Sequence, residues 1–198
     1  MNVVLTVLYI GFLGTAGWAG SGLRGPHRPI ATWVVFATVA VFSFLQLLAA
    51  PALFTALRRD RTAIADGQLW RLLTSAVVQD GGWPGTIFNL IALAALGLLA
   101  ERLWGTRRWL ALALCVQLLG GLWGLVVQPV GAGTSLIDFG LGGALATTAA
   151  VVHRSPLAVV SLAAGSALLL LGDIHGGAAL AGALFALLTV LPLRSQAK

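Results

Sequence analysis

The sequence predicts an all-α polytopic membrane protein. Of its 198 residues, 59% are hydrophobic and only 9% are charged, and the mean hydropathy is +0.95. The apolar residues form successive runs of about 20 residues, which is the length that an α-helix needs to cross a bilayer. Charged residues gather at the ends of these runs rather than inside them. A soluble globular domain does not have this composition.

Seven apolar runs are expected to form helices. They are residues 3–18, 33–50, 86–100, 109–127, 136–152, 156–171 and 174–191. Residues 1–30 are expected to be an extra N-terminal transmembrane helix with a basic linker, because the first run lacks the basic leader and the cleavage site of a signal peptide. Residues 31–198 then form the membrane core.

The longest break in hydrophobicity is residues 51–84. It contains several charged residues, but its segment GQLWRLLTSAV alternates aromatic, apolar and polar side chains. This pattern is typical of short amphipathic helices that lie at a membrane surface. We therefore expect a structured outer loop rather than a solvated tail.

The basic residues predict the orientation in the membrane. Short connections on one side carry arginines, whereas the connections at 128–134 and 172–173 carry no charge except Asp173. The residues on the basic side are Arg24, Arg28, Arg102, Arg107, Arg108, Arg154, Arg194 and Lys198. By the positive-inside rule this side is cytoplasmic, so the C-terminus is expected inside and loop 51–84 outside. Short loops and the abundance of Ala, Gly, Leu and Arg favour a bacterial inner (plasma) membrane.

Composition also narrows the classes of partner. The net charge of +6 comes from arginines that flank apolar runs, so it indicates orientation and not nucleic-acid binding. No cluster of histidines and carboxylates has the spacing of a metal site, so no metal and no cofactor are expected. The expected partners are the lipid bilayer and a transmembrane protein substrate or client helix.

Chemistry is expected in residues 131–146, GAGTSLIDFGLGGALA, because polar groups at membrane depth are costly and usually functional. Ser135 lies here, and His175 begins a later apolar run. A serine and a histidine on separate helices are the minimum for an activated nucleophile. Ser135 is 19 residues from Arg154, and His175 is 19 residues from Arg194. At about 1.5 Å per residue the two side chains are therefore expected at nearly equal depth.

Four segments lie in a distinctive order between about Gly67 and Leu191. They are GQLWRLLTS with Trp70 and Arg71, FNLIALAALGLLAERLWG with Asn89, Glu101 and Gly105, GTSL around Ser135, and HGGAALAG from His175. In this order and spacing they resemble the rhomboid family of intramembrane serine proteases. The resemblance implies a rhomboid-like six-helix core preceded by one extra N-terminal helix.

The same resemblance implies site residues and an activity. Ser135 would be the nucleophile and His175 the general base, and Asn89 would stabilise the oxyanion together with the Ser135 backbone N–H. Such an enzyme would be a serine endopeptidase that cleaves transmembrane substrates near the outer membrane face. A serine hydroxyl needs a base, and a tetrahedral oxyanion needs fixed donors, so these residue types suit the chemistry.

The chain departs from the family pattern in ways that keep an inactive protein open. Gly85 stands where the family usually has a histidine, and Leu136 stands where a glycine usually follows the serine. The segment GLGGALA fits a second register in which Gly142 takes the place of the serine. The alternative is a catalytically inactive rhomboid-like protein that binds transmembrane helices. A small transporter fits less well, because no charged pair lies at the membrane midplane.

Each candidate residue also has a structural interpretation. Ser135 with Asp138 forms a Ser-x-x-Asp pattern, which caps the start of a helix. Asn89 could join two helices by a hydrogen bond, and His175 could bond a neighbouring backbone carbonyl. Asp173 is expected to be an N-terminal cap. Glu101 is expected to form an ion pair with the arginines that follow it.

Overall fold

The computed structural model describes residues 3–190 and confirms the all-α polytopic membrane fold. Five helices are long and apolar enough to cross a membrane, and two shorter apolar helices follow them. The long helices are α1 (Val3–Ser21), α2 (Ile30–Leu48), α6 (Gly82–Trp104), α7 (Thr106–Val127) and α8 (Ser135–His153). The shorter ones are α9 (Pro156–Leu170) and α10 (Ile174–Phe185), which continues as a short π-helix, Ala186–Val190. Each corresponds to one predicted apolar run.

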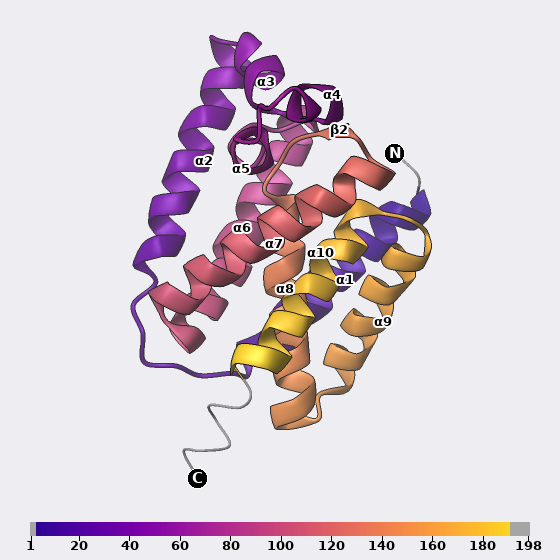
Figure 1. Ribbon diagram of the computed structural model, residues 1–198. Helices are drawn as coiled ribbons and strands as arrows, with labels where there is room; N and C mark the ends of the chain where they lie inside the picture. Colours follow the sequence, from indigo (N-terminus) through magenta and orange to yellow (C-terminus); the bar gives the residue numbers. More distant parts are fainter. Residues whose placement is uncertain (1–2, 191–198) are drawn as a thin grey trace.

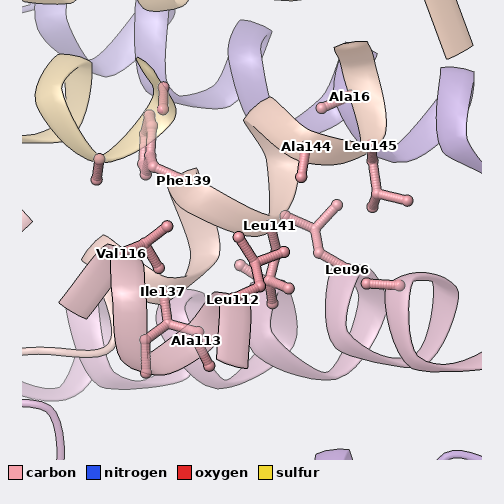
Figure 2. Close-up of a cluster of buried hydrophobic side chains, with 14 of the residues drawn as sticks. Ala16, Leu96, Leu112, Ala113, Val116, Ile137, Phe139, Leu141, Ala144 and Leu145 are labelled. Carbon is pink, nitrogen blue, oxygen red and sulfur yellow. The ribbon is translucent and has the colours of Figure 1, made fainter. Parts of the chain in front are cut away.

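Helix α8 is the centre of the bundle and is surrounded by α1, α6, α7, α9 and α10 (Figure 1). Its residues from Leu136 to Ala149 are buried without a break. Figure 2 shows how its side chains Ile137, Phe139, Leu141 and Leu145 meet those of the neighbouring helices. Because every face of α8 is covered by protein, its polar groups are shielded from lipid.

Small residues let α10 approach α8 at backbone distance. A methyl group added to Gly182 would overlap the carbonyl oxygen of Gly140, and one added to Gly143 would overlap that of Ala179. Such contacts are typical of helix pairs in membranes, where close approach replaces the hydrophobic effect as a source of stability. The glycines therefore fix the distance between the helices that carry Ser135 and His175.

Helix α1 is an integral part of this bundle, since it packs mainly against α8 and α9. The Phe12 ring stacks on the Phe139 ring of α8, with centroids 4.8 Å apart. The Ser161 hydroxyl of α9 donates to the Phe12 carbonyl at 3.1 Å. Helix α2, in contrast, lies at the edge and packs mainly against α6.

The loop between α2 and α6 is structured, as its pattern predicts. It contains α3 (Ala52–Leu57), β1 (Arg59–Asp60), α4 (Arg61–Ala65) and α5 (Arg71–Thr74). Strand β1 pairs antiparallel with β2 (Val130–Gly131), so the loop is tied to the segment before α8. The Arg71 guanidinium holds the loop together through the Gln68 side chain and the carbonyls of Thr55 and Arg58. These elements gather at one end of the bundle (Figure 1).

The basic linker and the α6–α7 turn meet at the opposite end, where the His27 N–H donates to the Arg102 carbonyl. The prediction that Glu101 forms an ion pair with the arginines that follow it is wrong. Its buried carboxylate accepts the N–H groups of Ala31 and Thr32 at 2.9 and 2.7 Å and the Thr106 hydroxyl at 2.6 Å. The first N–H groups of α2 have no partner within their own helix, so this carboxylate caps them. Arg194 and Lys198, used above to predict orientation, lie outside the described residues.

Candidate active site

A cavity of about 340 Å³ opens between α1, α6, α8 and α10, at the end of the bundle that carries the loop. Asn89, Ser135 and His175 all line it. A smaller cavity of about 50 Å³ also contacts Ser135 and His175. The three residues that the sequence proposes for catalysis therefore surround one space.

Ser135 is the first residue of α8 and is half-buried. The expected cap by Ser135 is not formed: Thr134 is the N-cap residue of α8, and it makes no side-chain cap hydrogen bond, although its hydroxyl donates to the Asp138 carboxylate at 3.3 Å. Within residues 3–190, the Ser135 hydroxyl has no hydrogen-bond partner and does not cap its own helix. It is available to the cavity.

Gly133 shows where the Ser135 hydroxyl points. Its φ is +134°, a backbone conformation that favours glycine. A methyl group there would lie 3.0 Å from Gln79 Oε1, 3.1 Å from Asn89 Nδ2 and 3.8 Å from Ser135 Oγ. The serine hydroxyl and the asparagine amide thus converge on the same small space, which the absence of a side chain at Gly133 leaves open.

Asn89 lies on α6 and donates from Nδ2 to Gln79 Oε1 at 2.8 Å. Gln79 is itself held by Gln46 of α2, whose amide pairs with the Gln79 backbone N–H and carbonyl, each at 2.8 Å. The Asn89 partner is therefore a loop residue and not another transmembrane helix. Sequence reasoning did not single out Gln79, although a glutamine directly after an apolar stretch was a visible signal.

His175 lies in the first turn of α10, and its ring is tightly surrounded. Its Nδ1 lies 2.7 Å from Asp173 Oδ1, and the ring packs against Tyr9 and Phe139, each with centroids 4.6 Å away. Asp173 caps α10, as predicted, by accepting the His175 N–H at 2.9 Å. Its second oxygen accepts the Tyr9 hydroxyl of α1 at 2.6 Å. Tyr9 was missed by sequence reasoning, since nothing in the pattern of α1 marks it.

Two ionisable groups beside the cavities, Asp173 and Arg59, have lowered pKa values for different reasons. Burial raises the pKa of the Asp173 carboxyl, but the hydrogen bonds and charge of His175 and the Tyr9 hydroxyl outweigh it, so the pKa is lowered. Burial lowers the pKa of Arg59, which lines the smaller cavity, and the charge of Asp80 partly opposes this. The site thus holds an ionised carboxylate beside the histidine.

Within the described residues, no hydrogen bond joins the Ser135 hydroxyl to His175. Asp173 occupies Nδ1, so Nε2 is the ring nitrogen available to the serine. Catalytic hydrogen bonds are often long before substrate binds. The arrangement supplies a free hydroxyl, an oriented imidazole and an amide donor around one cavity.

Gly142, the alternative to Ser135, faces another neighbour. A methyl group there would lie 2.7 Å from the Phe12 ring and 3.5 Å from Ala16 of α1. Neither cavity that contacts His175 is lined by Gly142. If Gly142 took the place of the serine, no nucleophile would lie near His175. Ser135, in contrast, lines both cavities that contact His175.

A comparison with protein families matches residues 66–196 to the Rhomboid domain, which is more than half of the chain. The chain belongs to the rhomboid family. The rhomboid-matched region contains Asn89, Ser135 and His175, whereas α1 and α2 precede it.

The chain is also similar to the rhomboid protease GluP of Bacillus subtilis (strain 168), with 36% identity over 88 residues. The aligned segment is 44% of this chain but only 17% of that protein. This chain therefore matches a small part of its rhomboid relative.

Proposed function

We propose that this chain is an intramembrane serine endopeptidase that cleaves transmembrane protein substrates near the outer membrane face. The observation that carries the proposal is the convergence of the Ser135 hydroxyl, the Asn89 amide and the His175 ring on one cavity. Membership of the rhomboid family and the likeness to a rhomboid protease support it. The protein acts in a bacterial inner membrane, with its C-terminus in the cytoplasm.

The proposed reaction uses each group in turn. His175 Nε2 takes the proton of Ser135 as Oγ attacks the carbonyl carbon of the scissile peptide. Asn89 Nδ2 and the Ser135 backbone N–H stabilise the oxyanion that forms on the carbonyl oxygen. His175 then returns the proton to the leaving amine, and a water molecule, deprotonated by the same histidine, hydrolyses the acyl-enzyme.

A fluorophosphonate probe tests for an activated serine, because it phosphonylates such residues covalently. We expect the purified protein in detergent to be labelled, and labelling to vanish in Ser135→Ala and in His175→Ala. Ser166→Ala is the matched control, because Ser166 is exposed on α9 and its hydroxyl bonds its own helix at Leu162. Labelling of Ser135→Ala at the wild-type level would contradict the proposal.

The second candidate is a catalytically inactive rhomboid that binds transmembrane helices. It is favoured by the absence of a Ser135–His175 hydrogen bond in the described residues and by Gly85, which replaces the usual histidine. A wild-type protein that neither reacts with the probe nor cleaves any transmembrane peptide in a library, but binds such peptides, would establish this function instead.

A further inference from the structure

We propose that Asp173 is a positioning residue that fixes the tautomer and orientation of His175, and that Tyr9 of α1 holds its carboxylate in place. The inference rests on the proposed function and deepens it, because it adds a third and a fourth side chain to the Ser135–His175 pair. It also gives α1, which lies outside the matched rhomboid region, a part in the site.

The Asp173 carboxylate contacts the imidazole ring directly. An ionised carboxylate can only accept hydrogen bonds, so an Nδ1 that lies 2.7 Å from Asp173 Oδ1 must carry the proton. In the neutral imidazole, Nε2 is then unprotonated and can accept the proton of Ser135. A partner on one ring nitrogen is the usual way in which proteins select the tautomer of a functional histidine.

Capping alone does not account for the contacts of the Asp173 carboxylate. Asp60 caps α4 through one oxygen, which accepts the N–H groups of Thr62 and Ala63. Asp173 caps α10 in a similar way, but its capping oxygen also meets the imidazole and its other oxygen meets Tyr9. The Asp173 and His175 side chains are only 12% and 15% exposed.

Neighbouring helices fix the carboxylate and the ring together. The Tyr9 hydroxyl holds Asp173 Oδ2, and the Tyr9 ring packs against the imidazole. Phe139 of α8 packs against the imidazole as well, and the Trp123 indole N–H of α7 donates to the Asp173 carbonyl at 3.2 Å. The histidine is therefore oriented by groups from α1, α7 and α8.

Nitrogen NMR of the protein labelled with ¹⁵N-histidine in detergent tests this tautomer directly, without any activity. The measurement is made at pH 9, well above the ordinary histidine pKa of about 6.5. His27→Gln and His153→Gln identify the His175 signals by elimination. We expect a protonated Nδ1 in the wild type.

Two variants at position 173 separate positioning from capping. In Asp173→Ser the hydroxyl still caps the helix but offers no carboxylate to Nδ1, so we expect the Nε2–H tautomer that predominates in an unconstrained imidazole. In Asp173→Asn the cap holds the amide oxygen at the Oδ1 position, so the Nδ1–H tautomer is retained. Asp60→Ser, which alters a cap outside the site, should leave the His175 signals unchanged.

Labelling by the fluorophosphonate probe provides the second measurement. We expect Asp173→Ser to react about 100-fold more slowly than the wild type, and Tyr9→Phe, which keeps the ring but loses the hydroxyl, to react several-fold more slowly. An Nε2–H tautomer in the wild type, or the same tautomer in wild type and Asp173→Ser, would overturn the inference. A wild type with the Nδ1–H tautomer but no labelling would contradict the proposed function and leave the positioning role supported.

Discussion

Asn89 shows how one side chain can serve both the loop and the cavity. A primary amide has two N–H groups, and Gln79 Oε1 engages Nδ2 at 2.8 Å. The same nitrogen would lie 3.1 Å from a methyl group placed on Gly133, in the space toward which Ser135 also points. One N–H therefore fixes the amide, and the other is available for the proposed oxyanion.

Asn89→Ala removes this donor, and we expect the rate of peptide cleavage to fall by about 10²–10³-fold. The fall should lie in kcat, because the oxyanion exists only in the transition state and not in the bound substrate. Steady-state kinetics on a transmembrane substrate in detergent measure it. The thermal unfolding curve of the same sample shows whether the variant is folded, and a folded variant with a kcat within twofold of the wild type would contradict the oxyanion role.

At the scale of the residue, the sequence draws attention to single polar side chains but not to the pairs that they form. Ser135, His175 and Asn89 stand out because polar groups are rare in apolar runs. The Tyr9–Asp173 bond joins residues 164 positions apart, and no local pattern encodes such a contact. Tyr9 lies in a helix that is apolar on every face, so its neighbours were not predictable.

At the scale of the element, the helices could be predicted because each apolar run is one helix. Helix α6 begins at Gly82, four residues before the predicted start, because Pro84 lies in its first turn, where no N–H is needed. The pairing of β1 with β2 was not foreseen, because two residues are too short to show the alternation of a strand.

The contact between α8 and α10 gives a prediction about stability. Gly182→Ala must push α10 away from the Gly140 carbonyl, and we expect a loss of about 1–3 kcal/mol in the free energy of unfolding. Gly14→Ala is the matched control, because a methyl group there meets no atom within 4 Å. Unfolding of both variants in detergent, followed by circular dichroism, makes the comparison. Equal stability of the two would show that the close approach of α8 and α10 is not required.

At the scale of the whole molecule, the distribution of charge predicts the orientation of the cavity. The cavity lies at the end that carries α3, α4 and α5, and the linker with Arg24 and Arg28 lies with Arg102 at the other end. The positive-inside rule places this second end in the cytoplasm. The cavity is then expected to face outward.

Single cysteines in a Cys115→Ala background test this orientation. Ala65 in the loop and His153 at the basic end are both exposed. We expect Ala65→Cys to react with a membrane-impermeant maleimide in intact spheroplasts, and His153→Cys to react only after lysis. The reverse pattern would place the cavity on the cytoplasmic side.

The bond between Tyr9 and Asp173 also has a consequence for biosynthesis. Helix α1 leaves the ribosome long before α8 and α9, so it must wait in the bilayer for the neighbours that cover it. Ser135 is translated 40 residues before His175, and during that interval the proposed nucleophile has no base. A nascent chain is therefore expected to lack the complete Ser135–His175 pair until α10 joins α1 and α8.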